Sequence, residues 1–272
     1  MIIQGEWERH INGWVTWSRA AGRPETTTQQ RRYHLTRVAK AMPTGPTTVT
    51  ADDLATWLGA QEWAPETRRG YRGTLRAFFG WMQASGRRVD SPAHLLPPVK
   101  VPRGRPRPTP ETIYRQALAD APPRDRRAIR LAAQCGLRRG EIARTHREDV
   151  VEDLEGWSLR VVGKGGHVRN VPLPDDLARE LLSLPDGWVF PSPTRAGQHL
   201  TPHHLGKIVS RWLGDKWTTH TLRHRCGTRA YTETRNIRAV QELLGHAKIE
   251  TTVLYTKVDD EQVRAAMRAA AA

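Results

Sequence analysis

The first third of the chain carries apolar residues at the spacing of amphipathic helices. One stripe lies at the start and consists of Ile3, Trp7, Ile11 and Trp14, at intervals of four, four and three residues. A second helix is expected from about Thr26 to about Met42. Thr50 and Asp53 stand at the N-cap and N3 positions of a third helix, and Pro65 suits the first turn of a fourth. The pattern predicts a helical domain over residues 1–95.

The fourth helix has two faces of different character. Its inward face is expected to consist of Tyr71, Leu75, Phe78, Phe79 and Met82. Arg68, Arg72 and Arg76, four residues apart, share another face. Because like charges at this spacing destabilise an isolated helix, we expect these arginines to bind phosphates; a solvated basic face is the alternative. Six of the ten tryptophans lie in this part of the chain and are expected in its core.

A proline-rich stretch, LPPVKVPRGRPRPTP, follows at residues 96–110. It contains six prolines, four basic residues and no acidic residue, so it can form neither a helix nor a central strand. We expect a basic linker over residues 96–108 and a second domain over residues 109–272.

Beyond the linker the pattern is helical, with one short pair of strands. Thr109, Pro110 and Glu111 are expected to supply an N-cap, a first-turn proline and an acid near the positive end of a helix. Residues 157–162 and 167–171 flank the sequence GKGG and predict a β-hairpin with Lys164 at its tip. Further helices are expected at 125–134, from 139, at 175–184, from 202, from 218 or 219, and at 237–244, 249–255 and 259–270, with a short strand at 188–190. The predicted fold class is mainly α, with a small antiparallel β-hairpin or sheet in the second domain.

Charge narrows the choice of partner. The 272 residues have a formal net charge of +15 and a pI of about 10.7, a surplus best tolerated beside a polyanion. Nucleic acid is therefore the expected partner, and Arg103 and Arg105 of the linker are expected to contact it; a solvated linker is the alternative. Two cysteines without a disulfide framework suit a reducing cytosol. Because no apolar run approaches the ~20 residues of a membrane span and no signal peptide begins the chain, no membrane partner is expected.

One set of side chains fits phosphodiester cleavage. That reaction needs a nucleophile, cations for the non-bridging oxygens and a proton for the leaving oxygen. The chain offers, in order, Arg138, Lys164, His220, Arg223, His246 and Tyr255. A tyrosine, with a pKa near ~10, can attack when neighbours share its proton. Two arginines can clamp a phosphate, and a lysine on a hairpin can reach the leaving group.

Two competing readings of these motifs fail. His224 lies four residues after His220, which is the spacing of a helical metal pair, but no carboxylate ligand and no HExxH sequence accompanies it. GKGG lacks the spacing of a nucleotide-binding P-loop and the Ser or Thr after the lysine. Neither a metal nor a cofactor is expected.

Four segments together closely resemble one family. The segments CGLRRGEIA, VGKGGHVRNVPLP, HTLRHRCGTRA and IRAVQELLGHAKIETTVLYTKV are similar to the tyrosine recombinases, the class of phage integrases and Xer-type recombinases. The resemblance covers about residues 107–272, and the helical first part resembles the family's core-binding domain in topology. It implies a two-domain, C-shaped clamp that holds DNA between a helical domain and an α+β catalytic domain.

The resemblance assigns a role to each motif residue upstream of the HxxR pair. Arg138 matches the first arginine that clamps the phosphate, in preference to Arg139 beside it. Glu141 matches the acid that supports this arginine. Lys164 matches the hairpin lysine that protonates the leaving 5′-oxygen.

The later motifs complete the set. His220 and Arg223 match the HxxR pair, which handles a proton and holds the phosphate, and His224 is expected to have a structural role. His246 matches a residue that hydrogen-bonds the scissile phosphate. Tyr255 matches the nucleophile, which forms a 3′-phosphotyrosine and frees a 5′-hydroxyl.

Family membership also implies partners and a location. Double-stranded DNA attachment sites, a homotetramer with C-terminal helix exchange through the tail after Asp259, and an accessory directionality factor are the expected partners. The expected location is the cytoplasm, at the nucleoid of a bacterium or phage-infected host.

The type of recombinase follows from smaller features. Because the first helix is expected to begin almost at Met1, no arm-binding domain is expected. Integration and excision of a phage or other mobile element is favoured, because the tryptophan-rich first half lacks an obvious Xer-type signature. Xer-like resolution of chromosome or plasmid dimers is the alternative. A type IB topoisomerase is disfavoured by the short C-terminal helix, and a DNA-binding regulator by the complete constellation.

Overall fold

The computed structural model describes residues 2–102, 106–163 and 166–245, and it divides into two compact units, residues 1–104 and 105–272. Each unit has its own apolar core and is described by itself. Within the described residues, no helix is long and apolar enough to cross a membrane. Several predicted features lie outside these residues: the helices at 249–255 and 259–270, Arg103, Arg105, Lys164, His246 and Tyr255.

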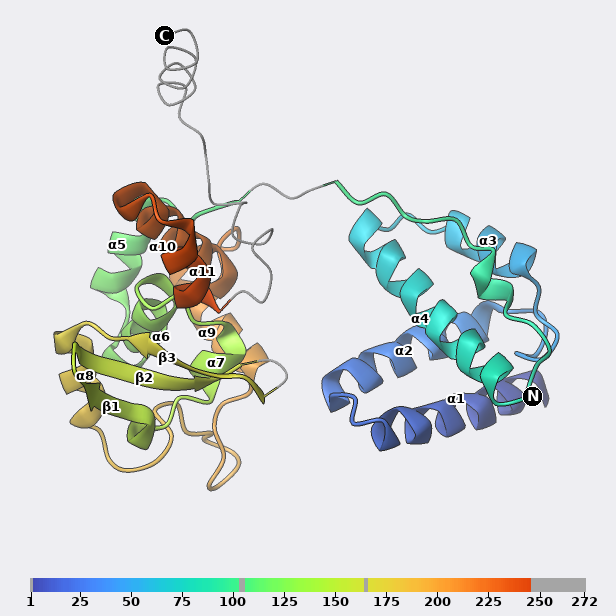
Figure 1. The fold of residues 1–272 in the computed structure, drawn as a ribbon, viewed down its shortest axis with the longest axis horizontal. Helices are drawn as coiled ribbons and strands as arrows, with labels where there is room; N and C mark the ends of the chain where they lie inside the picture. The colour runs from blue at the N-terminus through green and yellow to red at the C-terminus, as the bar shows by residue number, and fades with distance from the viewer. Residues whose placement is uncertain (1, 103–105, 164–165, 246–272) are drawn as a thin grey trace, which may run out of the picture. The chain divides into compact units, whose positions relative to one another are not determined.

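The first unit contains the four predicted helices (Figure 1). Their bounds are α1, Ile2–Ala20; α2, Glu25–Ala41; α3, Ala51–Gly59; and α4, Pro65–Ala84, followed by a short 3₁₀ turn, η1, Pro92–His94. The cap of α3 is the predicted one: the Thr50 N–H donates to Asp53 Oδ2 at 2.9 Å, and the Asp53 N–H donates to Thr50 Oγ1 at 3.1 Å. Local capping chemistry therefore fixes where this helix begins.

Aromatic side chains form the core of the first unit. All five apolar residues predicted on the inward face of α4 are buried. Trp7 is fully buried and stacks on Phe78 with ring centroids 5.9 Å apart. The prediction fails for Trp17, which is 43% exposed because the buried stripe of α1 continues from Trp14 through Ser18. Arg23 covers the ring of Trp17 instead.

The arginine ladder of α4 bonds to the chain that surrounds it. Arg68 Nη2 donates to Gln61 O at 2.6 Å. Arg72 donates through Nε and Nη2 to Leu96 O at 3.1 and 3.0 Å. Arg76 Nη1 donates to the carbonyl oxygen of residue 94 at 3.3 Å. This face is therefore more than a solvated basic surface, since each guanidinium also satisfies a backbone acceptor.

The second unit combines seven helices in its described part with a three-stranded antiparallel sheet in the order β1–β2–β3. The helices are α5, Glu111–Asp120; α6, Pro123–Ala133; α7, Arg139–Ala143; α8, Asp175–Leu182; α9, Pro202–Leu213; α10, Thr219–Thr234; and α11, Ile237–Leu244. The strands are β1, Val150–Asp153; β2, Gly156–Val162; and β3, Val168–Pro172. A 3₁₀ turn, η2 (Arg147–Asp149), precedes β1. The mainly helical fold class with a small antiparallel sheet is confirmed.

Helix α6 is the centre of this unit. Ile129, Leu131 and Ala132 are fully buried, and α10 packs against α6 while α8 packs against β1 and β2 (Figure 1). A helix buried on this scale holds its neighbours rigidly, because interiors are close-packed. Helices α7 and α10, at the GLRRGE and HxxR motifs, therefore rest on a common support.

Three local features differ from the expectations. Strand β1 was not expected; it is short, ends in two acids and pairs with β2 from Val150 to Asp153. Residues 188–190 form no strand: Trp188 makes one isolated bridge with His146 and Pro191 makes one with His199, so the segment changes partner before a ladder can extend. Thr109 does not cap α5. The N-cap is Pro110, without a side-chain hydrogen bond, because the Thr109 hydroxyl bonds to a different helix.

Candidate active site

A tight turn between α6 and α7 presents the GLRRGE motif. Gly136 has a φ of +64°, and a Cβ added there would lie 2.5 Å from Leu244 Cδ2, so only glycine fits. The chain then reverses at Arg138, the N-cap of α7, whose N–H donates to Glu141 Oε2 at 2.9 Å. The carboxylate thus caps the helix and stands beside the arginine side chain.

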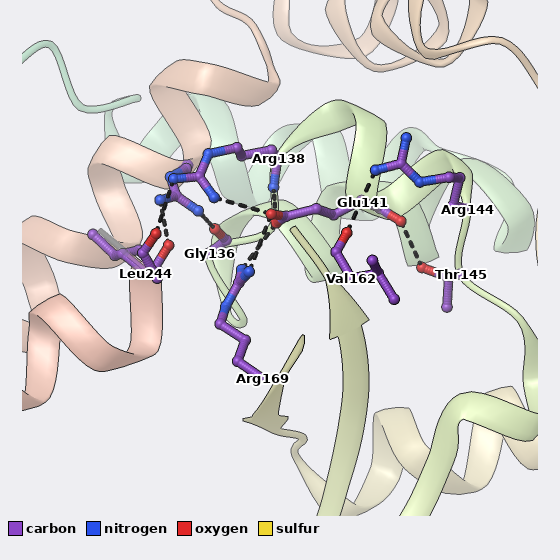
Figure 2. A network of polar contacts seen from close by, with 10 residues as sticks. Gly136, Arg138, Glu141, Arg144, Thr145, Val162, Arg169 and Leu244 are labelled. Atoms are coloured by element: carbon purple, nitrogen blue, oxygen red, sulfur yellow. Dashed lines mark hydrogen bonds and ion pairs between the residues drawn. The ribbon is translucent and has the colours of Figure 1, made fainter. Parts of the chain in front are cut away.

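Glu141 is the hub of the network. Its carboxylate is 3% exposed and also accepts from Arg138 Nη1 at 2.9 Å and from Arg169 Nη1 and Nη2 at 3.1 and 2.9 Å. Figure 2 shows the carboxylate between the two guanidiniums. Burial by itself would raise the pKa of Glu141, but the Arg169 and Arg138 hydrogen bonds and charges outweigh it and lower the pKa to about 2. The carboxylate is therefore charged at neutral pH and holds both arginines in place.

Arg169 is a site residue that the motif comparison missed. It lies on β3, where its side chain is 17% exposed, and forms a bidentate pair with Glu141. The sequence holds a partial signal: Arg169 has the same strand parity as the apolar Val171, which the structure shows to be buried, but nothing in it named the partner acid. A basic residue on the inward face of a strand needs a buried acid as partner, because an unpaired buried charge is costly.

Arg223 lies deep in α10 and is 2% exposed. Its Nη1 donates to Gly136 O and its Nη2 to Leu244 O, while Arg138 Nη2 donates to Gly245 O at 3.2 Å. Both predicted clamp arginines are thus bonded to the Leu-Gly of the LGH motif, which brings them to one place in the structure. Gly245 has a φ of +60°, and a Cβ there would lie 2.8 Å from Arg169 Nε.

Two histidines of α10 form a pair. His220 Nε2 and His224 Nε2 are 3.1 Å apart, so one ring donates and the other accepts. Burial lowers the pKa of His224 to about 4, helped by His220 and Arg223. Partial burial, followed by the charges of Arg223 and Arg138, lowers the pKa of His220 as well. Both rings are therefore neutral at pH 7, and His220 can accept a proton.

A cleft of about 570 Å³ gives access to these groups. Its described lining includes Arg138, Arg139, Lys207, His220 and Arg223, and no carboxylate is among the described lining residues. The Arg139 side chain packs against α9, since a Cβ at residue 206 would lie 3.8 Å from Arg139 Cδ. Such a cleft attracts an anion and offers it several N–H donors.

Two motif residues outside the described part follow residues that are placed at this site. Lys164 follows Gly163 in the chain, and a Cβ at Gly163 would lie 3.8 Å from Glu141 Oε1. His246 follows Gly245, whose carbonyl accepts from Arg138. The structure thus brings together Arg138, Glu141 and the two residues of the HxxR motif. It also places Gly163 and Gly245, which precede Lys164 and His246 in the chain, beside this network.

Comparisons with known proteins agree with this geometry. The Phage integrase family matches residues 111–262. Tyrosine recombinase XerA of Thermococcus kodakarensis is 33% identical over 210 residues, which cover 72% of this chain and 72% of that protein. Tyrosine recombinase XerC of Rhodospirillum centenum is 33% identical over 234 residues, 76% of this chain and 67% of that protein.

Solved structures show the same fold at lower identity. A lambda integrase dimer bound to a COC′ core site aligns with a TM-score of 0.73 and 18% identity, covering 93% of this chain and 96% of that chain. A lambda integrase tetramer bound to a Holliday junction aligns with a TM-score of 0.72 and 20% identity, covering 93% of this chain and 79% of that chain. The alignments cover 93% of this chain, so the likeness of fold extends beyond the motif-bearing part.

Proposed function

Because the chain belongs to the phage integrase family, the tyrosine recombinases that cleave and rejoin DNA through a tyrosine, we propose that it integrates and excises a phage or other mobile element. The observation that carries the proposal is the cleft where Arg138, His220 and Arg223 meet, with no carboxylate among the described residues that line it. These are the groups that an anionic phosphoryl transition state needs.

The two arginines are the proposed clamp of the scissile phosphate. Negative charge grows on the non-bridging oxygens as the nucleophile adds, and fixed guanidiniums stabilise that charge more strongly in the transition state than in the ground state. Arg138, whose side chain is 40% exposed, is the one that can turn toward a ligand while Glu141 holds its other edge. Arg223 supplies a buried charge behind it.

We propose the chemical roles of the remaining groups from the family motifs that they match. Tyr255 Oη attacks the phosphorus, a Tyr–phosphate bond forms and the bond to the 5′-oxygen breaks. His220, neutral at pH 7, accepts the phenol proton, and Lys164 protonates the leaving 5′-oxygen. His246 hydrogen-bonds the phosphate. A 5′-hydroxyl from a partner strand then reverses these steps. One ester replaces another, so the reaction requires neither ATP nor a hydrolytic water.

The partners follow from the same chemistry. We propose that residues 1–95 form the core-binding domain, that residues 96–108 are the linker and that residues 109–272 are the catalytic domain on double-stranded DNA. We propose that four copies act through a Holliday junction; a lambda integrase tetramer bound to a Holliday junction is among the similar structures. Arg68, Arg72 and Arg76, together with Arg103 and Arg105 of the linker, are proposed phosphate contacts. Both sets of arginines are positively charged, and positive charge favours association with DNA phosphates.

One observation favours a second candidate. The matched XerA and XerC proteins are 33% identical to this chain, which suits Xer-like resolution of chromosome or plasmid dimers. The chemistry and the site residues are the same in both candidates, and only the DNA target differs.

Covalent trapping tests the proposal. Wild type, Tyr255→Phe and the control Tyr33→Phe, at a tyrosine 58% exposed in the first unit, are incubated with fragmented DNA from the source genome. Wild type and the control should give adducts that resist SDS, and Tyr255→Phe should give none. The trapped sequences should lie at the ends of a mobile element; sites unrelated to any element would favour the Xer-like candidate. Tight binding by wild type without an adduct would contradict strand cleavage.

A further inference from the structure

Thr109 marks the end of the proline-rich stretch and is tied to the helix that carries the HxxR motif. It is 3% exposed. Its backbone N–H donates to Thr221 O at 3.1 Å, and its hydroxyl lies 2.8 Å from Thr221 Oγ1. The two residues are 112 apart in sequence. A residue that local rules place at the start of α5 is thus bonded to the first turn of α10.

Counting hydrogens gives the direction of the hydroxyl bond. Thr221 Oγ1 has one hydrogen and donates it to Thr218 O at 2.9 Å, while it accepts from the Thr218 N–H at 2.9 Å. Its remaining role toward Thr109 is as acceptor, so Thr109 donates. The hydroxyl of Thr109 therefore supports the capping box that opens α10.

Neighbours of Thr109 contact the same helix. Glu111 Oε2 accepts from Arg225 Nε and Nη2 at 2.9 and 2.7 Å, and Arg225 lies one turn after Thr221 on the same face. On the other side, the Arg107 guanidinium lies 5.0 Å from the centroid of the Trp217 ring. Residues 107–111 thus follow the start of α10 from residue 217 to residue 225.

Prolines make this segment stiff. Pro106, Pro108 and Pro110 alternate with the contacting residues 107, 109 and 111, and each fixes its own φ and offers no N–H of its own. A segment with so few accessible conformations loses little entropy when it is held. It can therefore transmit a displacement to α10 rather than absorb it.

We propose that residues 107–111 are a positioning strap for α10, with Thr109 as its central positioning residue, and that through it the linker sets the orientation of His220 and Arg223 at the cleft. This rests on the proposed recombinase function. Thr221 directly follows His220 and lies two residues before Arg223, so a shift of the first turn moves both groups. A displacement of residues 107–111 would therefore reach both groups through Thr221.

A substitution of nearly equal shape tests the strap. Thr109→Val removes the donated hydrogen bond and keeps the backbone N–H, Thr109→Ser retains the hydroxyl, and Thr112→Val alters an exposed threonine three residues on as a matched control. Single-turnover cleavage of a nicked DNA substrate should fall about tenfold in Thr109→Val, because the loss of one buried hydrogen bond lets His220 and Arg223 leave their productive positions. Its DNA Kd should stay within about twofold of wild type, and Thr109→Ser and Thr112→Val should cleave like wild type. Equal loss of binding and cleavage, or no loss, would overturn the proposal.

Amide hydrogen exchange separates the strap from the proposed function. In Thr109→Val the amides of residues 219–223 should exchange faster, while those of α6 stay protected. Arg107→Gln, at an exposed position that perturbs no core, should show a smaller effect on the same amides. Unchanged protection in α10 would refute the strap even if cleavage were impaired. A wild type that forms no DNA adduct would refute the function and leave this exchange result decisive for the strap.

Discussion

Glu141→Gln removes the charge at the centre of the site and leaves the shape nearly unchanged. Four N–H donors from Arg138 and Arg169 converge on two carboxylate oxygens. Glutamine has one acceptor oxygen, and its NH₂ must face at least one of these donors. The variant therefore leaves a guanidinium of limited exposure without a counter-charge, which is costly.

The pKa of Glu141 gives the size of the expected loss of folding free energy. It lies at about 2, against 4.5 for the ordinary group. At 1.36 kcal/mol for each pKa unit this corresponds to about 3 kcal/mol of folding free energy at pH 7. Buried pairs that lose one partner show losses of this order. Because the second unit spans residues 105–272, we expect its Tm to fall by roughly 6–12 °C.

Calorimetry of the full chain is the assay. The transition of the second unit should move and that of the first unit should not. Glu148→Gln is the matched control, because its carboxylate is 74% exposed in the same unit, and it should change Tm little. A Tm of Glu141→Gln within about 2 °C of wild type would refute the reasoning, since it would mean that the arginines do not depend on this charge.

The same pKa predicts a pH dependence. The folded-state pKa of Glu141 is below the unfolded value, so its contribution is fully present above the unfolded pKa and is lost as the pH falls toward the folded one. The stability gap between wild type and Glu141→Gln should therefore be constant near neutrality and shrink between about pH 5 and pH 2. A gap that stayed the same through this window would contradict the pKa assignment.

Three further predictions concern the reaction and DNA binding. Arg138→Ala should abolish cleavage of a nicked substrate and leave the DNA Kd nearly unchanged, because the clamp acts in the transition state; an equal loss of binding would count against it. Arg72→Gln should lower the salt slope of log K for DNA binding by about 1. Arg69→Gln is the control, because Arg69 is paired with Glu66 on an exposed face. An unchanged slope for Arg72→Gln would mean that Arg72 bonds to Leu96 O and contacts no phosphate. Cleavage should persist in EDTA, and a collapse there would refute metal-free transesterification.

Local rules predicted most of the elements. The capping box at Thr50, the cap at Thr201 and the cap at Thr218 each involve residues within three positions of one another, and such signals survive in a single sequence. The hairpin around GKGG and the helix at 237–244 follow equally from nearby residues. The residues of the HxxR and GLRRGE motifs were found by pattern, and the fold then brings them to one cleft.

Long-range partners were beyond these rules. Arg169 and Glu141 are 28 residues apart, and no local pattern pairs them. Thr109 satisfies every local requirement for a helix cap, yet its hydroxyl bonds to Thr221 because tertiary packing offers a buried acceptor. Propensity and capping describe what a segment prefers alone, and tertiary contacts override that preference where they bury a polar group with a partner.

The two glycines of the motifs belong to the site although they contribute no chemistry. Gly136 and Gly245 both have positive φ, and each would clash through an added Cβ, with Leu244 in one case and Arg169 in the other. Their carbonyls accept from Arg223 and Arg138 respectively. Main-chain acceptors thus aim the side chains that the cleft presents, and they can do so only where the backbone takes conformations that other residues resist. The geometry of such a site therefore depends on a backbone path as much as on a set of functional groups, and a substitution at either glycine should misplace an arginine without removing it.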